Sequence, residues 1–138
     1  MYILDTNVVS ELRKTQSGRA DAGVIAWSES VAPAQLYLSA VTIFEIELGI
    51  QRLSRRGDQI DRLRLWLTDH VLRAFDGRIL PIDEHVALFF ARMMVPDTRP
   101  YRDTLIAATA QHHGYTVVTR NLKDFEGLPI CLLNPWQD

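Results

Sequence analysis

The chain has 138 residues, of which 47% are hydrophobic and 23% charged, and its formal net charge is −2. This length suits a single domain, 1–138, with its own core, and the composition excludes a disordered protein. The net negative charge excludes a protein that coats nucleic acid through a uniformly basic surface. Five arginines gather in one stretch, where a solvated helical face is the favoured interpretation: Arg52, Arg55, Arg56, Arg62 and Arg64.

The only cysteine, Cys131, cannot form an internal disulfide, so a reducing cytoplasm is the expected compartment. Its strand-like surroundings predict a buried, unreactive thiol. The N-terminus lacks the basic start and apolar stretch of a signal peptide. The most apolar stretch, 86–95, contains Arg92 and is too short to span a bilayer, so we expect no membrane association.

The N-terminal third alternates short apolar runs with helical patterns. Residues 2–4 form a β-favouring run that ends at Asp5, in a sequence typical of a turn or helix N-cap. Helices are predicted over 8–13 and 24–31. A second strand is predicted over 36–38, closed by Ser39. The pattern is therefore strand, helix, helix, strand.

The middle of the chain predicts a helical arm. Val41 begins a helix that Gly57 ends, and its predicted apolar face is Val41, Phe44, Leu48 and Leu53. Residues 58–75 form a second amphipathic run with apolar residues at helical spacing.

The C-terminal part returns to alternation. The predicted elements are a strand or extended segment over 79–82, a helix over 83–95, a helix opened by Asp103 and capped at Gly114, a strand over 116–119, a turn over 120–127 and a strand over 130–133. Strands that alternate with helices indicate a three-layer α/β/α fold with a central, mainly parallel sheet of four to five short strands. Alanines in the helix after Asp103 would permit close approach to that sheet.

Four acidic residues converge in this arrangement. Asp5 directly follows the first strand, Glu45 lies early in the helix after Ser39, Asp103 opens its helix, and Asp124 follows the strand over 116–119. Because ligands bind beyond the carboxyl ends of parallel strands, these side chains would share one crevice. Taken alone, Asp5 or Asp103 is better explained as a helix cap, whereas Glu45 has little structural reason to sit in an apolar helix. Glu47 would point elsewhere, solvated or paired.

Ionised carboxylates in one crevice repel each other unless a cation lies between them. An all-oxygen ligand set suits Mg²⁺ or Mn²⁺, which also bind substrate phosphate. Such ions can polarise a phosphodiester and activate water, so phosphodiester hydrolysis is the predicted chemistry.

Four blocks carry a resemblance: Leu-Asp-Thr-Asn-Val-Val-Ser-Glu from Leu4 to Glu11, Phe-Glu-Ile-Glu-Leu-Gly from Phe44 to Gly49, Asp-Thr-Leu-Ile-Ala-Ala-Thr-Ala from Asp103 to Ala110, and Thr-Arg-Asn-Leu-Lys-Asp-Phe-Glu from Thr119 to Glu126. Together, in this order, they resemble the PIN-domain toxins of the VapC type, especially the FitB-like branch. The match spans nearly the whole chain.

The resemblance implies a PIN-like fold and a Mg²⁺- or Mn²⁺-dependent endoribonuclease that acts on RNA, the toxin of a type II toxin–antitoxin pair. It also implies a homodimer and a cognate antitoxin partner. The family's acids fall on Asp5, Glu45, Asp103 and Asp124, of which Asp5 and Asp103 would bind metal, Glu45 directly or through water, and Asp124 through water. Matching polar residues are Thr6, Asn7, Thr119 and Asn121. The alternative is a PIN-like module that binds RNA or protein without cutting.

Other residues are assigned to structure. Arg102, where the family more often has a small or apolar residue, is expected to point to water. The histidines His70, His85, His112 and His113 lack metal-ligand spacing, and adjacent positions 112 and 113 should not face one site. Trp27, Trp66 and Trp136 are predicted to anchor the core rather than stack on bases.

Overall fold

The computed structural model describes residues 1–137; Asp138, the last residue of the predicted domain, lies outside them. Its strands are β1 (Tyr2–Leu4), β2 (Leu36–Ser39), β3 (Ile79–Leu80), β4 (Thr116–Val118) and β5 (Leu132–Leu133). They form one five-stranded sheet in the order β3-β2-β1-β4-β5, and every neighbouring pair is parallel. This confirms the predicted parallel sheet, with β1 at its centre.

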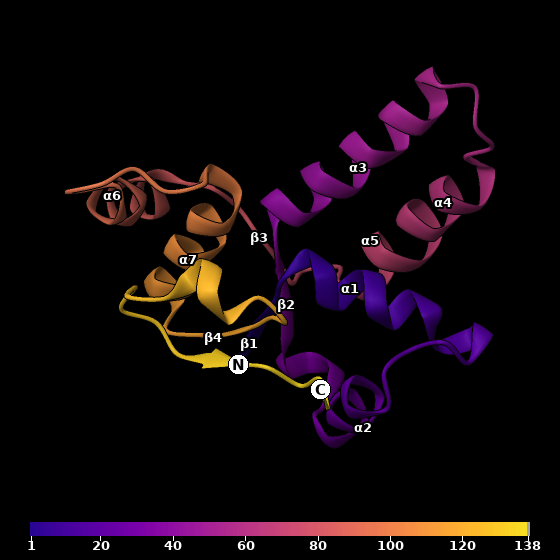
Figure 1. Ribbon diagram of the computed structural model, residues 1–138, viewed down its shortest axis with the longest axis horizontal. Helices are drawn as coiled ribbons and strands as arrows, with labels where there is room; N and C mark the ends of the chain where they lie inside the picture. Colours follow the sequence, from indigo (N-terminus) through magenta and orange to yellow (C-terminus); the bar gives the residue numbers. More distant parts are fainter. Residues whose placement is uncertain (138) are drawn as a thin grey trace.

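The helices are α1 (Thr6–Arg13), α2 (Ala22–Ser30), α3 (Ala40–Arg55), α4 (Asp61–Leu65), α5 (Leu72–Ala74), α6 (Glu84–Met93) and α7 (Tyr101–His113). Short 3₁₀ turns are η1 (Lys14–Ser17), η2 (Pro33–Gln35) and η4 (Leu122–Phe125), and a π-helical turn, η3 (Trp66–Val71), joins α4 to α5. Figure 1 shows α3 rising as one limb of the predicted helical arm, with α4 and α5 returning beside it. Within residues 1–137, no helix is both long and apolar enough to cross a membrane.

Local hydrogen bonds set several of the boundaries. The side chains of Asp5, Ser39 and Asp83 cap α1, α3 and α6 by accepting backbone N–H groups. Gly114 ends α7 in the left-handed conformation, at φ 73°, as its sequence predicts. By contrast, α7 begins at Tyr101, before the expected start at Asp103, because the chain turns helical directly after Pro100.

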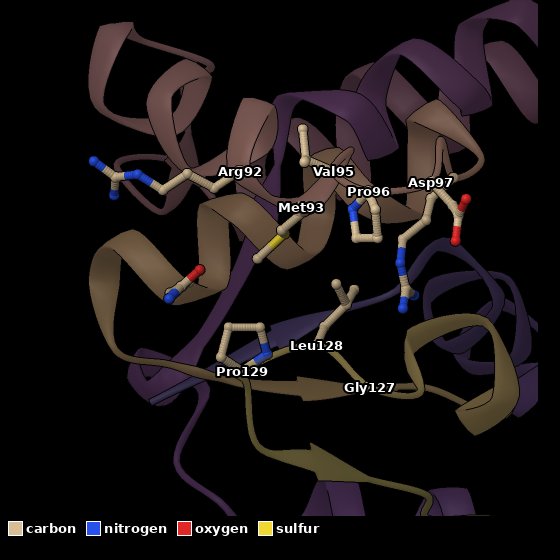
Figure 2. Close-up of a pocket in the computed structure, with 10 residues that line it drawn as sticks. Arg92, Met93, Val95, Pro96, Asp97, Gly127, Leu128 and Pro129 are labelled. Carbon is tan, nitrogen blue, oxygen red and sulfur yellow. The ribbon is translucent and has the colours of Figure 1, made fainter.

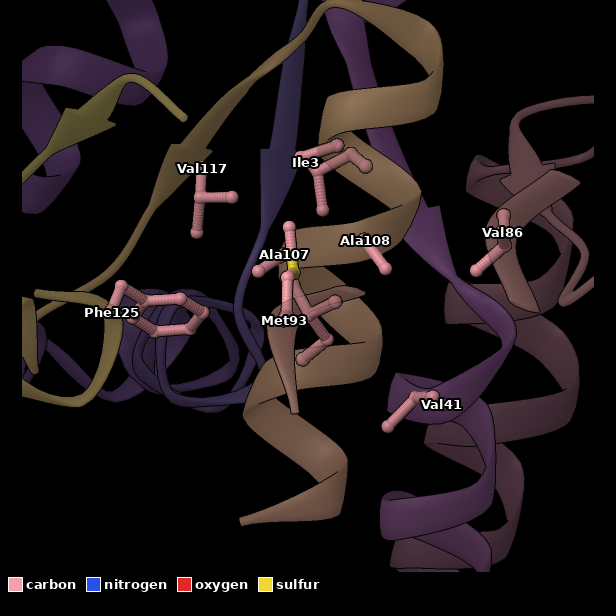
Figure 3. Close-up of a cluster of buried hydrophobic side chains, with 10 residues drawn as sticks. Ile3, Val41, Val86, Met93, Ala107, Ala108, Val117 and Phe125 are labelled. Atoms are coloured by element: carbon pink, nitrogen blue, oxygen red, sulfur yellow. The ribbon is translucent and has the colours of Figure 1, made fainter. Parts of the chain in front are cut away.

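The sheet separates two hydrophobic clusters because successive strand residues face opposite sides. Ile3 and Val117 face α6, α7 and η4, where Figure 3 shows them with Ala107 of α7 and Phe125 of η4. Leu4 and Val118 instead face α1, α3 and the arm. Three layers result, in agreement with the predicted fold class. The small residues of α7 are completely buried against the sheet, as expected.

The half-buried tryptophans Trp27, Trp66 and Trp136 all pack against the second cluster, as expected, while the absence of base stacking stays a prediction. The expected apolar face of α3 is wrong. Phe44 is 53% exposed, and the residues buried in its place are Thr42, Ile46 and Ile50 together with Val41. The sheet, rather than the count of large apolar residues, decides which face of α3 turns inward.

Three further expectations are corrected. Cys131 is exposed: it lies directly before β5, and although its carbonyl accepts the backbone N–H of Val117, its side chain is not in the core. The run 58–75 is interrupted by the π-helical turn instead of forming one regular helix, although Leu67 and Val71 are buried as its spacing predicts. The last strand is also shorter than the predicted 130–133.

Candidate active site

A pocket of about 440 Å³ lies beyond the carboxyl end of β1. Its lining residues are Asp5, Thr6, Asn7, Ser10, Glu11, Lys14, Glu45, Asp103, Arg120, Asn121 and Trp136. Three of the four predicted acids therefore share it, each from a different element: the β1–α1 junction, α3 and α7. The parallel sheet brings them together as the sequence predicts, because α1 and α3 both begin where a strand ends.

Asp5 is a helix cap and a pocket residue at the same time. Its Oδ1 accepts from the backbone N–H of Thr6 at 2.8 Å, and its Oδ2 accepts from Thr119 Oγ1 at 2.8 Å and from Asn7 Nδ2 at 3.3 Å. The side chain is almost completely buried, and this burial raises the pKa of Asp5 despite the hydrogen bonds from Thr119 and Thr6. The charge of Asp124 adds to the rise.

Glu45 is linked to Asp5 through Thr6. Thr6 donates its hydroxyl to Glu45 Oε1 at 3.2 Å and lies 3.1 Å from Thr42 Oγ1. Burial is the main cause that raises the pKa of Glu45, followed by the charge of Asp5; the Thr6 hydrogen bond and the charge of Arg102 oppose it. The mostly apolar helix α3 thus carries Glu45, whose carboxylate faces that of Asp5.

Asp103 is the most strongly perturbed of the acids. Burial, followed by the charges of Asp5, Asp124 and Glu45, raises the pKa of Asp103 to about 6, and Arg102 only partly offsets this. Asp103 is the third residue of α7 and does not cap it, because Pro100 occupies the cap position. The interpretation of Asp103 as a simple helix cap therefore fails.

Asp124 lies apart from the other three. It is exposed on η4, lines a neighbouring surface hollow, and reaches the pocket through its charge on Asp5 and Asp103.

The polar residues around Asp5 are held by hydrogen bonds to one another. Thr119 is fully buried and accepts the backbone N–H of Asn121 at 3.0 Å, while Asn7 Nδ2 lies 3.4 Å from Thr119 Oγ1.

The donor set of Asp5, Glu45 and Asp103 fits a hard divalent cation, because it consists of oxygen atoms only and the charge of Asp5 raises the pKa of both Glu45 and Asp103. In residues 1–137, no three acidic, histidine or cysteine side chains already stand close enough to hold a metal ion. The acids line the walls of an open pocket.

The sequence did not point to several lining residues. Ser10, Glu11 and Lys14 follow Asn7 at helical spacing, so the periodicity of α1 carried a signal for them. No sequence signal pointed to Trp136, because only the return of the C-terminal segment past β5 places this residue at the pocket.

One expectation about the neighbouring side chains, that for Arg102, needs correction. Arg102 is exposed, but its guanidinium carbon lies 5.4 Å from the ring centre of Phe44 instead of pointing only to water. The rings of the adjacent His112 and His113 are in contact, with centres 4.6 Å apart, and His112 also stacks on His85 at 4.9 Å, but within residues 1–137 these histidines form no group that could hold a metal ion. His112 and His113 meet because both are in the last turn of α7, beside α6.

The PIN-domain family profile matches residues 2–129. The chain belongs to the PIN-domain family. This PIN domain is 37% identical to Toxin FitB of Neisseria gonorrhoeae over the full length of both chains, and 36% identical to VapC ribonuclease Y4jK of Sinorhizobium fredii over 99% of each. The crystal structure of FitAcB from Neisseria gonorrhoeae superposes with a TM-score of 0.83 at 34% identity and covers both chains completely. The predicted resemblance is confirmed.

Proposed function

We propose that this PIN-domain protein is a Mg²⁺- or Mn²⁺-dependent endoribonuclease and the toxin of a toxin–antitoxin pair. One observation carries the proposal: three carboxylates from separate elements share a pocket in which the pKa of each is raised. Similarity to proteins named as a toxin and as a VapC ribonuclease supports the same conclusion.

In this proposal Asp5, Asp103 and Glu45 hold the cation, and Asp124 acts through water from its exposed position. The cation would polarise the RNA phosphodiester and activate a water molecule. Thr6, Asn7 and Thr119 keep the oxygens of Asp5 in fixed directions through the hydrogen bonds described above, and Asn121 braces Thr119. These polar residues therefore orient the ligands.

The cleavage assay uses purified protein, structured RNA and Mg²⁺ or Mn²⁺. Asp5→Asn and added chelator should both abolish cleavage. Glu47→Gln is the matched control, because Glu47 lies on α3 only two residues from Glu45 but pairs with Arg64. Cleavage that persists in chelator or in Asp5→Asn would contradict the metal-carboxylate mechanism. RNA binding without cleavage by the wild type would favour the alternative, a non-cleaving module.

The toxin role predicts a cytoplasmic protein, a homodimer and an antitoxin partner. Expression of the wild type should arrest growth, expression of Asp5→Asn should not, and co-expression of a small DNA-binding protein encoded immediately upstream should restore growth. An isolated gene whose expression leaves growth unchanged would argue against the toxin role. Light scattering of the purified protein tests the dimer.

A further inference from the structure

Two arginines lie on aromatic rings beside the acidic pocket. The guanidinium carbon of Arg120 is 5.5 Å from the ring centre of Trp136, and that of Arg102 is 5.4 Å from the ring centre of Phe44. All four side chains come from different parts of the chain: the loop after β4, the C-terminal segment, α7 and α3. The fold therefore places two arginine–aromatic pairs beside the acidic pocket.

The Arg120–Trp136 pair belongs to the pocket wall. Both residues line the pocket, and the backbone N–H of Arg120 donates to Asn7 Oδ1 at 3.4 Å. The other cation of the lining, Lys14, forms a salt bridge with Glu11 at 3.1 Å, and the charge of Arg120 also acts on Glu11. Arg120 is thus the lining cation tied directly to the polar residues around Asp5.

The Arg102–Phe44 pair lies outside the lining of the pocket, next to two of its acids in sequence. Arg102 precedes Asp103 and Phe44 precedes Glu45, and the positive charge of Arg102 acts on both carboxyls. Phe44 is 53% exposed, an unusual position for a large aromatic residue on a helix that buries its opposite face. Because this exposed ring does not pack in the core, its contact with Arg102 is the role that the structure gives it.

An acidic pocket repels the RNA backbone, so an RNA-cleaving site of this kind needs cations near its rim. Stacking occupies the flat face of a guanidinium, whereas its N–H donors lie in the plane and can serve more than one acceptor, phosphate oxygens in particular. An aromatic platform also restrains the long side chain, which lowers the entropy lost when phosphate binds.

We propose that Arg120 and Arg102 bind the RNA backbone phosphates that flank the cleaved phosphate. This inference rests on the proposed ribonuclease function and adds how the substrate is held. Trp136 and Phe44 act through the arginines by orienting them.

The test compares Arg120→Gln and Arg102→Gln with a matched control, Arg92→Gln. Arg92 also stacks on an aromatic ring, with its guanidinium carbon 5.2 Å from the centre of Phe89, but it lines a different cavity of about 380 Å³ formed with the loop after α6 and residues 127–129 (Figure 2). The three variants therefore remove the same charge and the same kind of stacking.

Binding of a short fluorescent single-stranded RNA of mixed sequence is measured in Ca²⁺ at several salt concentrations. Each pocket variant should weaken binding about tenfold, as expected when a charge-assisted hydrogen bond is lost. The slope of log affinity against log salt should fall by about 0.7 for each arginine removed. With an RNA that the wild type cleaves, KM should rise and kcat should stay within about twofold.

Conservative variants separate positioning from folding. Arg120→Lys should keep the wild-type salt slope, and Trp136→Phe should keep the wild-type affinity, whereas Trp136→Leu should weaken binding. Equal affinity, salt slope and KM for the pocket variants and Arg92→Gln, in a wild type that cleaves RNA, would overturn this inference alone. Failure of the wild type both to bind and to cleave RNA would overturn the proposed function as well.

Discussion

Glu45 and Glu47 lie two residues apart on α3, yet they belong to opposite electrostatic environments. Glu45 faces Asp5 in the pocket, and burial and that negative charge raise its pKa. Glu47 faces the arm, where Arg64 Nη2 donates to its Oε2 at 2.9 Å and Gln51 Nε2 donates at 2.7 Å. These hydrogen bonds lower the pKa of Glu47 to about 2.

The comparison separates a carboxylate whose pKa is lowered by a hydrogen-bonded arginine from carboxylates whose pKa is raised by burial and only partly offset by the charge of Arg102. The sequence left Glu47 either solvated or paired, and the arm pairs it with Arg64 from α4. The pocket instead collects Asp5, Glu45 and Asp103 and raises the pKa of each. A site that costs folding free energy in this way is typical of one kept for ligand binding.

The largest expected effect is the loss of activity in Asp103→Asn. Removing one of three proposed metal ligands should lower kcat/KM by about 100-fold or more, because the loss of even a supporting group can cost up to that factor. Initial rates at saturating Mg²⁺ or Mn²⁺ measure this. A variant with nearly wild-type rates would remove Asp103 from the site.

Metal binding should raise thermal stability only when the pocket is intact. A cation present at about 100 times its Kd stabilises the folded state by about 2.7 kcal/mol, so Mn²⁺ should raise the Tm of the wild type and of Glu47→Gln. Asp5→Asn and Asp103→Asn should respond much less. An equal rise in all four proteins, measured by differential scanning fluorimetry, would place the metal elsewhere.

The pH dependence of the metal-free protein should reveal Asp103. Its pKa is about 6 in the folded state against an ordinary value of 3.8, so the folded state binds more protons between these values and loses stability as pH rises through about 6. Asp103→Asn should therefore be more stable than the wild type at pH 8, and the difference should shrink as pH falls below 6. Urea unfolding in EDTA measures it; a constant difference would contradict the assignment.

Glu47→Gln should have the smallest effect. Its ion pair with Arg64 is partly solvent-exposed on both sides, and such pairs contribute little to stability. Because the pKa of Glu47 is lowered, its contribution is present above pH 4.5 and is lost as pH falls toward 2. Activity within twofold of wild type and a slightly lower Tm at pH 7 are expected. A large loss of activity would mean that the arm and the pocket are coupled.

Much of the fold followed from local sequence signals. The order of strands and helices, the caps at Asp5 and Asp83, and the end of α7 at Gly114 depend on hydrogen bonds within a few residues, which the chain encodes locally. The convergence of Asp5, Glu45 and Asp103 followed from the parallel sheet. Their roles as metal ligands remain predictions.

Tertiary structure alone decided the environment of each of these residues. The sequence around Phe44 did not indicate that Phe44 would lie outside the buried face of α3. It also did not indicate that Arg102 would lie over the Phe44 ring. Likewise, Trp136 reaches the pocket only because the C-terminal segment returns past β5. Periodicity and caps act over one or two helical turns, whereas exposure, pKa and neighbouring charge depend on elements that are far apart in the chain and meet only in the folded core.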